Sequence, residues 1–105
     1  MHTFAEVWAW VKKVPRGRVV TYGQLSRLIE RRLTPVGVGW AMSAAPPDVP
    51  WHRVVNAKGG ISTKDGRQRA LLAKERVRFD EQDCVELARH QWQPKPRPRA
   101  RAAQK

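Results

Sequence analysis

Two helix start signals follow each other closely in this sequence, and together they limit the folds that it can adopt. Thr21 precedes Gln24 by three residues, the spacing of a capping box, in which each side chain bonds the backbone N–H of the other residue. Thr34 stands directly before Pro35, the pattern of an N-cap followed by proline at the first helical position. Prolines at 46–47 end the second helix. Two short helices with a tight connection predict a helix-turn-helix.

Hydrophobic spacing and turn residues predict further elements on either side of this helix pair. Apolar residues at i, i+3, i+4 and i+7 predict a first amphipathic helix that ends near Val14. These residues are Phe4, Val7, Trp8 and Val11. An extended run over residues 49–56, a turn at 57–60 and a return strand at 61–62 predict a small β hairpin, or wing.

The C-terminal third contains one more clear helix and then changes in composition. Asp65 is expected to cap this helix, with Leu71 and Leu72 buried. From Gln93 onward, prolines alternate with basic residues, a composition that cannot pack a core. We therefore expect a mainly α fold with a small β hairpin: a single winged helix-turn-helix-like domain over residues 1–92, followed by a flexible, disordered basic tail over 93–105.

The charge of the chain indicates a polyanionic partner. The formal net charge is +12, from 21 Lys and Arg against 9 Asp and Glu, and residues 93–105 supply only five of these cations. Such an excess on a small domain favours nucleic acid or an anionic membrane surface. No apolar run approaches the length of a membrane span, and residues 4–11 are too short for a signal peptide. Nucleic acid is therefore the expected partner, and the tail is expected to add nonspecific affinity through phosphate contacts.

The cysteine and histidine content argues against metal and disulfide chemistry in this chain. Cys84 is the single cysteine, so no disulfide can form within the chain. The three histidines, His2, His52 and His90, do not have the spacing of metal ligands. We expect no metal, no cofactor and a reduced, cytoplasmic setting, at the nucleoid if the source is bacterial.

Three segments in one order carry a resemblance to a known family. They are VPRGRVVTYGQL at residues 14–25, VGWAM at 38–42 and PWHRVVN at 50–56. Together they resemble the DNA-binding domain of O6-alkylguanine-DNA alkyltransferases, over about residues 4–92. Trp51 makes the resemblance strongest to the alkyltransferase-like proteins, the non-catalytic homologues.

The resemblance implies that alkyl transfer is lost. Trp51 stands where the family has the cysteine that accepts the alkyl group from O6 of a flipped guanine. Displacement at an alkyl carbon needs an activated thiolate, and an indole is neither nucleophilic nor ionisable at neutral pH. His52 and Glu75 match the residues that activate the cysteine, so we expect them to keep a structural role. Ala45 replaces an asparagine of the catalytic network, which agrees with the absence of catalytic residues.

The resemblance also implies how the chain meets DNA. The recognition helix, residues 35–45, enters the minor groove, and Tyr22 helps to rotate the target nucleotide outward. Val36 stands where the family has an arginine that fills the gap in the base stack, and an apolar wedge can take such a place. The expected lesion pocket comprises Tyr22, Trp51, Val54 and Lys64. The expected DNA contacts are Thr21, Tyr22, Thr34, Val36, Gly37, Gly39, Trp40, Ser43 and Arg53.

Three functions remain open at this level. The first is a monomeric, non-enzymatic sensor that binds O6-alkylguanine in duplex DNA, flips the nucleotide and marks the lesion for nucleotide excision repair proteins. The second is a small helix-turn-helix transcription regulator. The third is an alkyltransferase that uses Cys84. The sequence also leaves open whether Trp40 faces the groove or the core.

Overall fold

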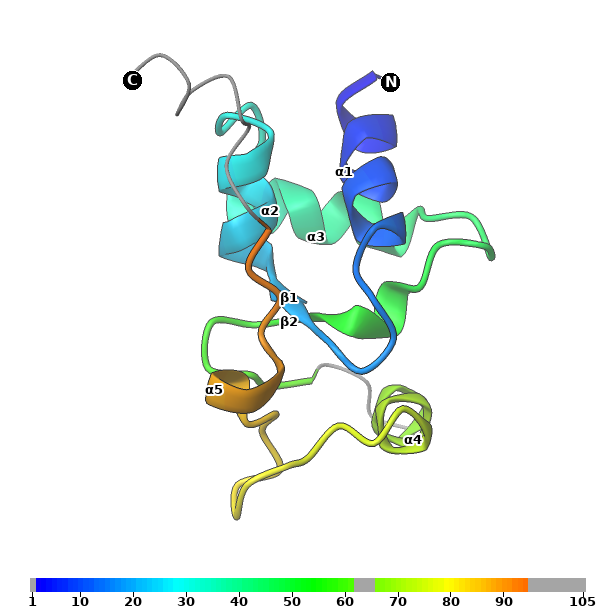
Figure 1. Ribbon diagram of the computed structural model, residues 1–105. Helices are drawn as coiled ribbons and strands as arrows, with labels where there is room; N and C mark the ends of the chain where they lie inside the picture. Colours follow the sequence, from blue (N-terminus) through cyan, green and yellow to red (C-terminus); the bar gives the residue numbers. More distant parts are fainter. Residues whose placement is uncertain (1, 62–65, 95–105) are drawn as a thin grey trace, which may run out of the picture.

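The computed structural model of this 105-residue chain describes residues 2–61 and 66–94. Helices α1, α2 and α3 pack together at one end of the molecule, while α4 and α5 lie at the other end, with two short strands between them (Figure 1). In chain order the elements are α1 (His2–Lys12), β1 (Val20–Thr21), α2 (Tyr22–Leu28), α3 (Pro35–Ser43), a 3-10 turn (Trp51–Arg53), β2 (Val54–Val55), α4 (Arg67–Lys74) and α5 (Leu87–His90). No helix in the described ranges is long and apolar enough to cross a membrane.

The predicted apolar stripe of α1 faces the core. Val7 and Val11 are fully buried, and Phe4 and Trp8 pack beside them against the same cluster. The indole N–H of Trp8 donates to the carbonyl oxygen of Ala41 at 2.8 Å. This bond ties α1 to α3, so α1 fixes the position of the helix that follows the turn.

The helix-turn-helix prediction is confirmed, including both caps. The Thr21 hydroxyl oxygen accepts from the Gln24 backbone N–H at 3.0 Å, and the Gln24 side chain accepts from the Thr21 N–H at 3.0 Å. At α3, the Thr34 hydroxyl accepts from the Gly37 N–H at 3.2 Å. Between the helices, Glu30 and Arg31 both adopt positive φ angles, of 61° and 62°. These two left-handed residues reverse the chain without a glycine.

A small β element is present, but its pairing differs from the predicted hairpin. β1 and β2 pair in parallel, with Val20 opposite Val54. The turn over residues 56–60 does form, and the Asn56 N–H donates to the Gly60 carbonyl at 3.0 Å. Ile61, however, belongs to no strand, and Ser62 lies outside the described residues. The hairpin prediction is wrong because Val54 is buried in the core, where a distant buried strand provides a better partner than the adjacent polar turn.

The two strands separate two apolar clusters. One cluster contains the buried residues of α1, α2 and α3 together with Val54, and the other contains Val19, Val55 and Leu72 with two valines of the C-terminal segment. α4 starts after Gly66, whose φ is +80°, while the expected cap Asp65 lies outside the described residues. Leu72 is buried as expected, and Leu71 is half-buried. The Trp51 turn leads directly into β2, so both clusters hold it in place.

Candidate nucleic-acid interface

The recognition helix α3 divides into three faces. Gly37, Val38 and Ala41 are buried against the core. Val36 and Trp40 are 66% and 68% exposed, so Trp40 faces outward and not the core. The third face is formed by Gly39, Met42 and Ser43, which line a pocket. Val36 and Trp40 together form an exposed apolar ridge along α3. An exposed apolar surface of this kind is typical of a site that contacts another molecule.

The pocket beside α3 brings together residues from four separate parts of the chain. It has a volume of about 150 Å³ and joins the third face of α3 to Tyr22, the first residue of α2, and to Trp51 on the 3-10 turn. The two aromatic residues that the sequence assigns to the lesion pocket therefore share one cavity. Val54 is 1% exposed and does not line it, so its assignment is wrong: the residue is held in the β1–β2 ladder. Lys64 lies outside the described residues.

Two residues of α4 that the sequence analysis missed complete the surroundings of Trp51. The guanidinium carbon of Arg67 lies 5.8 Å from the centroid of the Trp51 ring, within cation–π range. Gln68 lines the pocket and is 1% exposed. Its amide nitrogen donates to the carbonyls of His52 at 3.0 Å and Val54 at 2.9 Å, and so holds the turn that carries Trp51. The sequence did contain a sign that Gln68 is buried, because it stands four residues before Leu72 and therefore on the same face of the helix.

Glu75 organises a buried polar network behind the Trp51 turn. Its carboxylate accepts from Arg53 Nη2 at 2.8 Å, bonds His52 Nε2 at 2.8 Å and accepts from the Gly17 N–H at 3.1 Å. Burial acts to raise the pKa of Glu75, but the hydrogen bonds from Arg53, His52 and Gly17 outweigh it and lower the pKa to about 2. The carboxylate is therefore ionised at neutral pH and serves as an internal anchor.

This network changes the role of Arg53. The sequence analysis expects a DNA contact from this residue, but Arg53 Nε and Nη2 bond Glu75 and Nη1 donates to the Val14 carbonyl at 2.9 Å. We therefore reassign Arg53 to a structural role. Thr21, also an expected DNA contact, is 6% exposed, and its hydroxyl caps α2. His52 and Glu75 bond each other within this network at 2.8 Å.

Exposed cations flank the connection between α2 and α3. A surface pocket of about 340 Å³ is lined by Arg27 and Arg31, together with Thr34 and Pro35 at the start of α3. Arg32 points elsewhere, because its Nη2 pairs with Glu6 Oε1 at 2.5 Å and its Nε donates to a backbone carbonyl. This end of the molecule thus presents positive charge beside the exposed apolar ridge of α3, a combination typical of nucleic-acid surfaces.

Comparison with known proteins identifies the family. The family model described as the 6-O-methylguanine DNA methyltransferase DNA-binding domain matches residues 2–77. The chain belongs to this family. Alkyltransferase-like protein 1 of Schizosaccharomyces pombe is 33% identical over 102 residues, covering 87% of this chain and 94% of that protein. A DNA base-flipping protein of Vibrio parahaemolyticus is 31% identical over 94 residues, covering 85% of this chain and 94% of the relative.

Solved structures of the family share the fold. The crystal structure of S. pombe Atl1 in complex with damaged DNA containing O6-carboxymethylguanine matches with a TM-score of 0.76 and 32% identity, over 89% of this chain and 96% of that one. The crystal structure of Mycobacterium tuberculosis OGT in complex with DNA matches with a TM-score of 0.66 and 30% identity, over 71% of this chain and 50% of that one. The helix-turn-helix-like architecture is therefore the DNA-binding fold of the alkyltransferase family.

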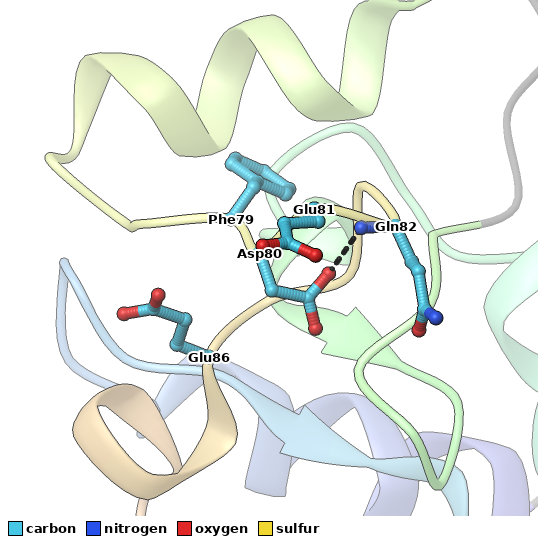
Figure 2. A pocket seen from close by; sticks show the side chains of 5 residues that line it. All are labelled: Phe79, Asp80, Glu81, Gln82 and Glu86. Carbon is cyan, nitrogen blue, oxygen red and sulfur yellow. Dashed lines mark hydrogen bonds between the residues drawn. The ribbon is translucent and has the colours of Figure 1, made fainter.

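A short acidic segment, residues 80–86, lines a surface pocket on another part of the molecule. Figure 2 shows Asp80, Glu81 and Glu86 around a surface pocket of about 620 Å³, with the Gln82 N–H donating to Asp80 Oδ1 at 2.8 Å. The segment that carries these carboxylates lies at the end of the molecule opposite α2 and α3 (Figure 1). Cys84 belongs to this acidic segment and does not line the Trp51 pocket.

Proposed function

We propose that this chain is a non-enzymatic sensor that binds O6-alkylguanine in duplex DNA, with α3 in the minor groove. The damaged nucleotide turns out of the duplex and enters the pocket of Tyr22 and Trp51. The observation that carries this proposal is the position of Trp51, which stands at the site of the family cysteine and lines the same cavity as Tyr22 and the third face of α3. The relatives named DNA base-flipping proteins and the complex of Atl1 with O6-carboxymethylguanine DNA support it.

The pocket suits recognition without transfer. Alkyl transfer needs a thiolate next to the alkyl carbon, and the single cysteine of the chain, Cys84, lies in the acidic segment. The Trp51 indole offers a flat apolar surface to an alkylated base, and Met42 adds a polarisable side chain to the same wall. Extrusion costs a few kcal/mol and costs least for a base whose pairing is already weak, so damaged guanine is preferred.

The proposal is tested by comparing binding to matched duplexes with and without O6-methylguanine, at the same salt concentration. We expect the wild-type chain to prefer the alkylated duplex and Trp51→Ala to lose most of that preference. Trp51→Phe keeps an aromatic surface and is expected to retain part of it. Equal affinity of the wild-type chain for both duplexes would overturn lesion recognition, and a methyl adduct on Cys84 in mass spectrometry would overturn the non-enzymatic assignment.

A sensor that binds the lesion without repairing it requires a second protein to complete the repair. A lesion that is held but not repaired must be passed to another activity, and we propose that nucleotide excision repair proteins recognise the complex of the DNA with one copy of this chain. An excision assay on a duplex with O6-methylguanine tests the step. The expected result is faster incision when this chain is added, with Trp51→Ala as the control, and an unchanged rate would contradict it.

A transcription regulator of the helix-turn-helix class is less well supported. Direct readout of bases needs side-chain donors and acceptors on the recognition helix. The exposed ridge of α3 instead presents Val36 and Trp40, and the hydroxyl of the neighbouring Ser43 donates to the Gly39 carbonyl at 3.2 Å. Selection from random duplexes is therefore expected to enrich no reproducible operator.

A further inference from the structure

The exposed ridge of α3 contains a tryptophan that packing does not explain. Trp40 is 68% exposed, although its ring is the largest apolar group on the helix. An α-helix turns about 100° per residue, so Trp40 lies about 100° around the axis from Gly39, which lines the Trp51 pocket. Buried Ala41 marks the core side in the other direction. The Trp40 side chain therefore projects from a flank of α3 that lies beside the pocket and outside the core.

The flank of α3 that carries Trp40 is expected to meet a base of the DNA when an extruded nucleotide occupies the Trp51 pocket. If one strand delivers a nucleotide to the pocket beside Gly39, we expect the adjoining flank with Trp40 to face the place where the former partner base is left unpaired. An unpaired base exposes a π-face, and stacking on an aromatic side chain stabilises it. Val36, one turn before Trp40, is also exposed but has no aromatic face. The ridge thus carries one group able to stack and one that only fills space.

We infer that Trp40 stacks on the base left without a partner when the damaged nucleotide enters the pocket. The inference rests on the proposed function and assigns to Trp40 the gap-filling role for which this chain has valine at position 36. Two features support duplex DNA as the occupant of this surface. The ridge is continuous with the pocket through Gly39 and Ser43, and the adjoining α2–α3 surface carries the exposed cations Arg27 and Arg31.

A coupling experiment between one side chain and one base tests the inference. The dissociation constants of the wild-type chain and Trp40→Ala are measured on an O6-methylguanine duplex and on the same duplex with an abasic site opposite the lesion. We expect Trp40→Ala to weaken binding by about fivefold or more when the opposite base is present, which is the contribution of stacking per base. Without that base, the loss should fall below about threefold.

Two further variants control for bulk and folding. Trp40→Phe retains a stacking face and should restore most of the affinity, whereas Val36→Ala should show no dependence on the opposite base. Because Trp40 is exposed, all variants should melt at the wild-type temperature. An unchanged affinity of Trp40→Ala, or an equal loss on both duplexes, would overturn the inference and leave the proposed function standing. If the wild-type chain fails to distinguish alkylated from unmodified duplex, the proposed function falls and the inference with it.

Discussion

Arg53 and Glu75 form a two-pronged ion pair behind the Trp51 turn, with Nη2 2.8 Å from Oε2 and Nε 3.0 Å from Oε1. The pair joins the C-cap residue of α4 to the turn that carries Trp51. His52 bonds the same carboxylate at 2.8 Å. The two residues after Trp51 are thus fixed from within, and the indole is held at the pocket wall while the chain on either side of it is anchored in the core.

Removing the charge of Glu75 should destabilise the fold and change its response to acid. Glu75→Gln leaves the Arg53 charge without its partner, and we expect the free energy of unfolding at pH 7 to fall by about 3 kcal/mol. The folded pKa of about 2 lies below the ordinary value of 4.5, so the stabilisation is present above pH 4.5 and is lost as the pH falls toward 2. Urea unfolding across this range should show a shallower acid loss in the variant, while the exposed control Glu81→Gln should behave like wild type.

Two substitutions of Gly39 should have separate effects, one on the stability of the fold and the other on the affinity for alkylated DNA. A Cβ atom at this position would meet nothing within 4 Å, so Gly39→Ala should stabilise α3 by about 0.5–1 kcal/mol through the better helix propensity of alanine. The larger Gly39→Leu places its side chain at the pocket wall and should lower the affinity for O6-methylguanine DNA. Thermal melts and binding to matched duplexes measure the two effects. Lesion binding by Gly39→Leu equal to wild type would argue against the pocket as the lesion site.

Two glycines with similar backbone angles should respond very differently to alanine. Gly59 has φ +86°, and a Cβ there would lie 2.4 Å from the Val85 carbonyl oxygen. Gly66 has φ +80° but open space around it. We expect Gly66→Ala to cost about 1 kcal/mol of unfolding free energy from backbone strain alone, and Gly59→Ala to cost clearly more because the C-terminal segment must move. Similar losses in chemical denaturation would contradict the close packing of Gly59 on Val85.

Arg31 should contribute to DNA affinity without contributing to lesion preference. It is exposed beside the start of α3, and a phosphate contact releases counterions. Arg31→Ala should weaken binding to alkylated and unmodified duplexes equally and reduce the slope of log K against log salt by about 0.9. Arg78→Ala, next to the acidic segment, is the matched control and should leave the slope unchanged. A changed preference for the lesion in Arg31→Ala would place this residue at the pocket.

The basic tail should add to the same salt dependence. Residues 95–105 contain five Lys and Arg and no acidic residue. A chain that ends at Pro94 should bind all duplexes more weakly, with a smaller salt slope than Arg31→Ala shows, while its preference for O6-methylguanine stays as in the full chain. Titrations at several salt concentrations measure both quantities. An unchanged slope would remove the tail from DNA binding.

Features that depend on residues close in sequence were predictable here. The caps at Thr21 and Thr34, the stripe of α1 and the tight connection between α2 and α3 are confirmed, because each depends on atoms a few residues apart. The indole at position 51, where the family resemblance expects a cysteine, is also a property of the sequence alone. An indole cannot take the role of a thiolate in any fold, so this inference needs no coordinates.

The tertiary structure decided which side chains remain for function. Val54 pairs with Val20 across the chain and leaves the pocket, while Arg53 is held by Glu75 and becomes structural. Gln68 reaches the pocket from α4, and Trp40 turns outward. None of these outcomes follows from local spacing. Each depends on a contact with a residue that is distant in the sequence and close only in the folded chain. The sequence by itself determined the helices and the indole at position 51, because these depend on neighbouring residues. Long-range packing determined the pocket and the side chains that α3 exposes.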